Sequence, residues 1–170
     1  MTFDVRAIFK ALNEAGVDYV VVGGLAVILH GYLRATADID LVIGLDRANG
    51  ERAVQALEGA GLKPRLPLPL ADLAREDARR EWGEHRNMLV FPLWDPGNPM
   101  RSVDVFVREP MPFVELARDA VVKKIDGMDV RVASIEHLIA MKRISSRARD
   151  LEDIEKLTAI QAMENKDESQ

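Results

Sequence analysis

The segment at residues 20–44, VVVGGLAVILHGYLRATADIDLVIG, constrains the fold of this chain more than any other part of it. Its residues are apolar enough to lie in a core, yet Asp38 and Asp40 stand among Ala, Ile and Leu. Residues two apart in a β-strand point to the same face of a sheet. We therefore expect a strand over 38–43 that projects both carboxylates to one face and sends the intervening apolar side chains into the core.

Two carboxylates held this close repel each other, and a cation between them allows both to stay ionised. Oxygen ligands without His or Cys nearby suit Mg²⁺ or Mn²⁺ rather than zinc. Mg²⁺ usually takes one or two carboxylates and completes its shell with phosphate oxygens and water. The plainer alternative is a sheet edge whose exposed face happens to carry Asp, and for a D-x-D motif on its own this alternative is the better one.

Two other features lie where they would complete such a metal site. Gly23 and Gly24 follow a predicted strand over 18–22 and open a predicted helix, where bare backbone N–H groups can meet phosphate oxygens. Asp104 alternates with apolar residues in a predicted strand over 101–107. Three carboxylates on two neighbouring strands, facing a Gly-Gly turn, form a pattern suited to phosphoryl or nucleotidyl transfer with two metal ions.

The rest of the chain alternates predicted helices and strands, without an internal repeat or a low-complexity linker. The further elements that we predict are helices over 2–15, 23–32 and 47–60, an irregular connection over 63–70, a charged helix or ordered loop over 71–84, strands over 86–91 and 101–107 around a loop over 92–100, a hairpin over 120–133, a helix over 135–147 capped by Ser134, and a helix over 151–163 capped by Asp150.

This order of elements predicts an α/β (α+β) fold, with a central mixed sheet, flanking helices and two C-terminal helices. We expect one domain over 1–165, made of a core over 1–133 and a helical pair over 134–165. The polar residues at 166–170 should form a frayed tail.

Composition restricts the class of protein further. A chain of 170 residues with 48% hydrophobic content can bury a core, and the lack of cysteine excludes disulfides and Cys-ligated zinc. It also fits a cytoplasmic location. Neither a signal peptide nor an apolar run of about 20 residues is present, so we expect no membrane partner. A net charge of −5 gives no global basic field, which argues against a large RNA-binding surface.

Two long motifs resemble those of the nucleotidyltransferase superfamily, which has the fold of DNA polymerase β. The first, GGLAVILHGYLRATADIDLVI, combines Gly-Gly, a helix and D-x-D on a strand. Arg34 and Thr36, just before the aspartates, make it similar to the abortive-infection (AbiEii-like) branch. The second, IEHLIAMKRISSRARDLEDIEKL at 135–157, resembles a Lys, Arg, Asp and Asp motif of that branch. Its matching residues are Lys142, Arg147, Asp150 and Asp153.

The resemblance, which covers residues 18–157, implies a Mg²⁺-dependent transfer of a nucleotide from an NTP to an acceptor hydroxyl. In that family Asp38, Asp40 and Asp104 would be the metal ligands and catalytic residues. The residues at the nucleotide would be Gly23, Gly24, Arg34, Thr36, Lys142 and Arg147. The resemblance also implies RNA or a protein as the acceptor, and an antitoxin protein as a partner in a toxin–antitoxin pair.

Several of these residues have a structural interpretation as well. Lys142 and Arg147 are five apart, so on a continuous helix they point in different directions, as solvated charges do. We expect Lys142 to be partly exposed. Asp150 and Asp153 fit a helix cap and its first-turn acid, or else they orient Arg147. His30 is interpreted as a packed or hydrogen-bonded structural side chain.

Two other functions remain open at this stage. One is a non-catalytic nucleotide-binding or partner-binding domain with the same fold, against which the presence of all three aspartates argues. The other is a small-molecule, antibiotic-like nucleotidyltransferase. Trp94, in the predicted loop over 92–100, has too many interpretations to be assigned to a site.

Overall fold

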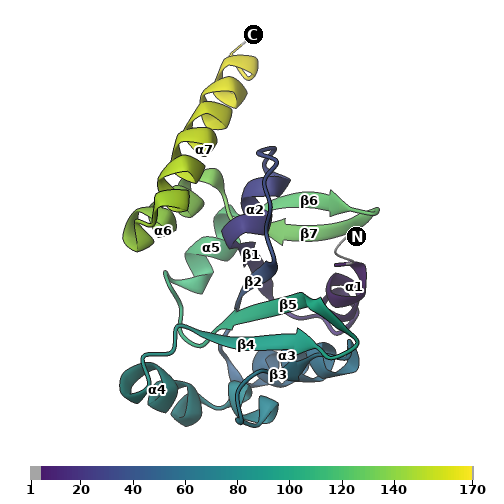
Figure 1. Ribbon diagram of the computed structural model, residues 1–170. Helices are drawn as coiled ribbons and strands as arrows, with labels where there is room; N and C mark the ends of the chain where they lie inside the picture. Colours follow the sequence, from purple (N-terminus) through teal and green to yellow (C-terminus); the bar gives the residue numbers. More distant parts are fainter. Residues whose placement is uncertain (1–4, 170) are drawn as a thin grey trace.

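The computed structural model describes residues 5–169, in which seven strands form one mixed sheet (Figure 1). The strands are β1 (Tyr19–Val22), β2 (Asp38–Ile43), β3 (Lys63–Pro64), β4 (Val90–Asp95), β5 (Asn98–Phe106), β6 (Val121–Ile125) and β7 (Met128–Val132). Their order in the sheet is β3-β4-β5-β2-β1-β7-β6. β1 and β7 run parallel, as do β2 and β5, and the other neighbours are antiparallel.

Two groups of helices accompany the sheet. The helices are α1 (Arg6–Glu14), α2 (Gly23–Leu29), α3 (Arg47–Gly59), a 3₁₀ helix (Leu70–Ala74), α4 (Glu76–His85), α5 (Phe113–Asp119), α6 (Ile135–Ser145) and α7 (Ala148–Asp167). α1 contacts α3, which also contacts the 3₁₀ helix, and α4 packs on the 3₁₀ helix in turn. α2 contacts α6, and α6 packs along α7 on the other side of the molecule (Figure 1).

The central strands are buried because their apolar side chains lie between these helices. All four residues of β1 are buried, as are Val103 and Val105 of β5. The predicted mixed sheet with flanking helices and two C-terminal helices is therefore confirmed. The predicted hairpin is also confirmed, with Asp126 and Gly127 at positive φ in its turn, as tight hairpin turns require.

One strand differs from its prediction. The strand predicted over 86–91 begins only at Val90 and continues to Asp95, through half of the predicted loop. Pro96 and Gly97 form a tight turn between β4 and β5, where the Gly97 N–H donates to Asp95 Oδ1 at 2.8 Å. Turn residues concentrated at 96–97 therefore mark a hairpin rather than a long loop.

Several helix boundaries also differ. α5 was not predicted, and the segment over 71–84 divides into the 3₁₀ helix and α4. α2 ends at Leu29, since Gly31 adopts a φ of +113° and stops the helix before residue 32. The start of the helix predicted over 2–15 lies outside the described residues.

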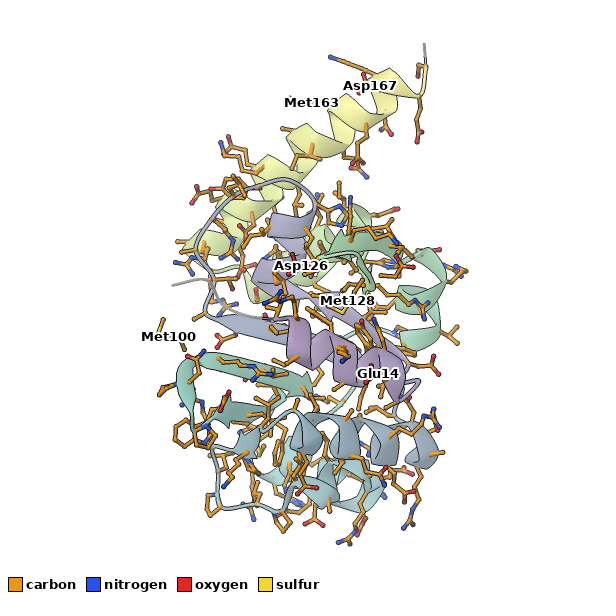
Figure 2. All side chains as sticks on the ribbon, turned by 90° about the vertical axis from the view of Figure 1, so that its right-hand side faces the viewer. Glu14, Met100, Asp126, Met128, Met163 and Asp167 are labelled. Carbon is orange, nitrogen blue, oxygen red and sulfur yellow. The ribbon has the colours of Figure 1, made fainter. Side chains whose placement is uncertain are left out.

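α7 is longer at both ends than the helix predicted over 151–163. It begins at Ala148 and continues to Asp167, into the predicted tail. Figure 2 shows Met163 and Asp167 on the part of α7 that extends beyond the rest of the molecule. Among the helices within residues 5–169, none combines the length and the apolar character that a bilayer crossing requires.

Candidate active site

The three aspartates come together because β2 and β5 are parallel neighbours. In their register Asp40 stands opposite Asp104, and Asp38 stands opposite Ser102. Paired residues on neighbouring strands point to the same face of a sheet, so Asp40 and Asp104 lie side by side with Asp38 next to them. The predicted pairing of these strands is confirmed. The Ser102 hydroxyl donates to Asp38 Oδ1 and fixes that carboxylate.

Burial and mutual repulsion strongly favour the protonated forms of two of these groups. Burial, then the negative charges of Asp104 and Asp38, raise the pKa of Asp40 from 3.8 to about 7. The charges of Lys142 and Arg147 act in the opposite direction. Burial and the charge of Asp38 raise the pKa of Asp104 to about 6. Such a cluster gains from a cation that keeps its members ionised.

Asp40→Asn should therefore stabilise the metal-free protein at alkaline pH. The folded protein keeps the Asp40 proton up to about pH 7, whereas the unfolded chain releases it near pH 3.8. The folding stability must fall as pH rises through this window, and the whole penalty is present above it. We expect Asp40→Asn to raise the free energy of unfolding by about 4 kcal/mol at pH 8 and to leave it unchanged below pH 4. Urea denaturation with EDTA at both pH values measures this difference, and a gain at both would contradict it.

Gly23 and Gly24 lie against the carboxylates and the loop before β2. A Cβ atom on Gly23 would stand 2.1 Å from Asp40 Oδ2, and one on Gly24 would stand 2.7 Å from Thr36 Oγ1 and 2.9 Å from Arg34 Nη2. All three distances are shorter than real Cβ contacts. The two glycines therefore allow the Asp40, Thr36 and Arg34 side chains to approach the backbone at the start of α2.

Gly23→Ala should displace the Asp40 carboxylate and abolish any activity of the site. Gly23 has a φ of +68°, so the substitution adds backbone strain of about 1 kcal/mol to the clash with Asp40. Gly16→Ala is the matched control, because Gly16 has a φ of +64° and nothing within 4 Å of its added Cβ. Both variants should lose stability from strain in thermal melts, and only Gly23→Ala should lose activity. Equal activity in the two variants would contradict this prediction.

The second motif forms a buried ion-pair network with the first. The fully buried Asp153 of α7 accepts through Oδ2 from Lys142 Nζ at 2.7 Å and from Arg34 Nη2 at 2.9 Å. Arg34 Nε also lies 2.9 Å from Asp153 Oδ1, as an ion pair whose N–H is not aligned for a hydrogen bond. Lys142 is only 7% exposed, so the expectation of a partly exposed lysine is wrong. Its ammonium is drawn in by the carboxylate of Asp153.

Asp150 and Arg147 form the start of α7. Asp150 is not the cap of this helix, because the helix begins at Ala148, with Arg147 as the capping residue. Asp150 instead accepts from the Arg147 N–H at 3.0 Å and from Arg147 Nε at 3.1 Å. Burial would raise the pKa of Asp150, but the hydrogen bonds from Ser145 and Arg147 outweigh it and lower the pKa to about 2. Asp150 thus contacts Arg147 and lies 3.6 Å from Lys142 Nζ, whereas Asp153 contacts Arg34 and makes the shorter contact with Lys142.

Two side chains outside the predicted site are also well defined. His30 Nε2 contacts the Ala133 carbonyl oxygen at 2.8 Å in a buried position, which confirms the structural interpretation. Trp94 lies in β4 rather than in a loop, and the Arg65 guanidinium stands 5.5 Å from its ring centre. Arg65 was missed because its surroundings, KPRLPLPL, indicate only an irregular connection. Its sole signal is a cation directly after the short strand β3.

The donor set fits a magnesium ion completed by its substrate. Within the described part of the chain, no group of three or more His, Cys, Asp and Glu side chains is arranged to hold a metal ion by itself. Mg²⁺ needs only one or two carboxylates when phosphate oxygens and water supply the rest. Asp38 and Asp40 of β2 would supply such a pair, with Asp104 of β5 beside Asp40 as a further oxygen ligand.

Comparison with solved structures finds similar folds among nucleotidyltransferases. The antibiotic-resistance factor ANT(2'')-Ia, in complex with adenylyl-2''-tobramycin, has a TM-score of 0.61 at 16% identity, over 95% of this chain and 89% of that one. The lincosamide antibiotic adenylyltransferase LnuA, with lincomycin bound, has a TM-score of 0.58 at 16% identity, over 90% and 93% of the two chains. An antigenic nucleotidyltransferase-like protein from Paracoccidioides brasiliensis gives 0.57 at 20% identity, over 90% and 72%.

These likenesses establish the architecture and not the reaction, because the identities are low. No family model matches the sequence, and no curated protein matches it. The resemblance to the AbiEii-like branch therefore rests on the two sequence motifs alone. The sheet and the solved structures similar to it show that the chain has the nucleotidyltransferase fold.

Proposed function

We propose that this protein is a Mg²⁺- or Mn²⁺-dependent nucleotidyltransferase that moves an NMP from an NTP to an acceptor hydroxyl. The observation that carries the proposal is the juxtaposition of Asp40 and Asp104 on parallel strands, with Asp38 beside them and Gly23 against them. These carboxylates would hold the metal. When bound, the metal would neutralise charge on the phosphate oxygens and acidify the attacking hydroxyl.

The residues of the chain have separate roles in this reaction. The acceptor oxygen attacks the α-phosphorus, the bond to the β-phosphate breaks, and pyrophosphate leaves with its electron pair. Asp104, whose pKa is raised to about 6, accepts the proton of the attacking hydroxyl. Gly23 and Gly24 leave room for the phosphates beside Asp40. Thr36, packed against Gly24, shapes the same edge.

Three cations near the α6–α7 pair, the buried Lys142, the largely buried Arg34 and the exposed Arg147, would serve the triphosphate. The charges of Lys142 and Arg147 act on Asp40, which places them within electrostatic reach of the metal site. Arg34 contacts Asp153 on one side and stands against Gly24 on the other. We assign Asp153 as the residue that orients Arg34 and Lys142. We assign Asp150 as the residue that orients Arg147.

The acceptor class follows from the resemblance and remains part of the proposal. It is RNA or a protein, with an antitoxin as partner and the cytoplasm as the location. A second candidate is a small-molecule adenylyltransferase, which is favoured by the fold neighbours that carry tobramycin and lincomycin products or substrates.

A labelling experiment tests the function and separates the acceptors. The protein is incubated with each α-³²P-labelled NTP, Mg²⁺, and either total RNA, lysate protein or tobramycin. We expect label to enter one acceptor class, and to do so only when Asp38 and Asp40 are intact. The Asp38→Asn/Asp40→Asn double variant is the control. A folded wild-type protein that labels none of the acceptors would favour a non-catalytic nucleotide-binding domain.

Metal binding should depend on the nucleotide. We expect weak binding of Mg²⁺ to the free protein and markedly tighter binding with an NTP present, because the phosphates complete the octahedral shell. Isothermal calorimetry measures both. Tight binding of Zn²⁺, together with no heat from Mg²⁺–NTP, would be the opposite outcome and would exclude the proposed ligand set.

A further inference from the structure

A row of side chains crosses four strands on the face of the sheet that carries the aspartates. Asp38 is paired with Ser102, Ser102 with Trp94, and Trp94 with Lys63, so these residues point to the same face from β2, β5, β4 and β3. Trp94 is only partly buried. The row therefore leads from the carboxylates to an indole ring and then to an ammonium group.

A second row runs beside the first and ends on another cation. Asp40 is paired with Asp104, and Asp104 with Pro92, whose carbonyl accepts from the Arg65 N–H at 3.0 Å. The Arg65 guanidinium stands over the Trp94 ring. Its charge also reaches Asp104, because it opposes the rise of that carboxyl's pKa that burial and Asp38 cause.

Neither of these two cations has an acidic partner in the part of the chain that the structure describes. Between residues 5 and 169, no carboxylate lies within ion-pair distance of Lys63 or Arg65, and both side chains belong to exposed residues. Met100, two residues before Ser102 in β5, is 66% exposed and adds an apolar side chain near this end of the row. Figure 2 shows Met100 at the edge of the molecule.

The order of the strands shows on which side of the aspartates Trp94, Arg65 and Lys63 lie, and this side determines which reactant they can contact. The glycines at the end of β1 and the cations of the α6–α7 network lie on one side of the aspartates, whereas Trp94, Arg65 and Lys63 lie on the other. If the triphosphate occupies the first side, the attacking group must approach Asp104 from the second. This step rests on the proposed function.

We propose that Trp94, Arg65 and Lys63 form the acceptor subsite, and that the acceptor is a nucleotide that stacks its base on Trp94 and places its phosphates against Arg65 and Lys63. Stacking on an indole ring suits a flat base. Unpaired arginine and lysine suit phosphate oxygens. The same two cations repel polycationic acceptors of the tobramycin kind.

Binding of a short oligonucleotide tests the subsite without any need for transfer. The probe is a hexamer of riboadenosine with a 5′-fluorescein and a free 3′-hydroxyl. It is titrated by fluorescence anisotropy in the presence of Mg²⁺ and an ATP analogue with a methylene group between its α- and β-phosphates, which occupies the triphosphate side. We expect Trp94→Leu and Arg65→Ala each to raise the Kd about 10-fold.

Arg47→Ala is the matched control, because Arg47 is an exposed arginine beyond the opposite end of β2. It should leave the Kd unchanged. Competition by AMP would show that a single nucleotide is enough to fill the subsite. Binding of the hexamer without competition by AMP would show that neighbouring phosphates are needed. Either result supports a nucleotide acceptor. Displacement of the hexamer by an equal concentration of tobramycin would overturn it, as would a Kd that neither substitution changes.

Arg65→Ala keeps the test decisive if Trp94→Leu impairs folding, since Arg65 is exposed. The result is also separable from the proposed function. A protein that binds the hexamer through Trp94 and Arg65 but labels no acceptor would contradict the transferase assignment alone. A protein that labels its acceptor with the same KM in both variants would contradict the subsite alone.

Discussion

Asp104→Asn should lower the rate of nucleotidyl transfer by at least about 100-fold while Mg²⁺–NTP binding persists. Asn keeps the size of the side chain but removes its charge and its ability to take a proton. The proposed ligands Asp38 and Asp40 would remain to hold the metal with the phosphates. Single-turnover kinetics with labelled NTP measure the transfer step, and calorimetry measures the binding.

The same substitution should not weaken the metal-free protein. Burial and repulsion by Asp38 raise the pKa of Asp104, so its ionisation opposes folding above about pH 6. Asp104→Asn should therefore be as stable as the wild type, or more stable, at pH 8 with EDTA. Transfer at the wild-type rate in this variant would show that another residue takes the proton and that Asp104 is not a catalytic residue.

Asp153→Asn should cause the largest loss of stability of any substitution at the site. It removes the one carboxylate that Arg34 and Lys142 share in a buried position. Loss of one partner from a buried ion pair costs about 3 kcal/mol, because the opposite charge stays buried without compensation. For a chain of this length that corresponds to a fall in Tm of about 10 °C. Differential scanning calorimetry measures it.

A matched aspartate on the surface provides the comparison. Asp77 is exposed and pairs with Arg75, so Asp77→Asn should leave the stability nearly unchanged. Equal effects of Asp153→Asn and Asp77→Asn would mean that the network contributes nothing to the fold.

Lys142→Met keeps the aliphatic stem of the side chain. It should weaken NTP binding more than NMP binding if Lys142 serves a distal phosphate. It should also lower the stability of the protein, since Lys142 is buried.

The sequence was sufficient where chemistry and local pattern coincide. Alternation around Asp38, Asp40 and Asp104 predicted both strands and the face that they share, because a period of two fixes the direction of every side chain. The predicted pairing of these two strands rests on the aspartates, because their carboxylates must lie together to share a metal ion. Their roles remain predictions.

The sequence was insufficient where the partner of a residue lies far along the chain. Lys142 looks exposed from its own helix, and only the fold brings Asp153 and Arg34 to it. The Pro and Gly residues around Trp94 predict a loop, whereas in the structure only Pro96 and Gly97 form a turn and Trp94 lies in β4. Arg65 acquired a position only when β3 paired with β4.

The Arg34–Asp153 contact joins residues 119 positions apart. During synthesis of the chain, the three aspartates and the glycines emerge from the ribosome well before Asp153 does. Until α7 has folded onto α6, Arg34 and Lys142 lack the carboxylate that holds them together. A nascent chain thus carries the proposed metal ligands before the proposed nucleotide-binding cations are fixed, which delays assembly of the complete site until α7 has been synthesised.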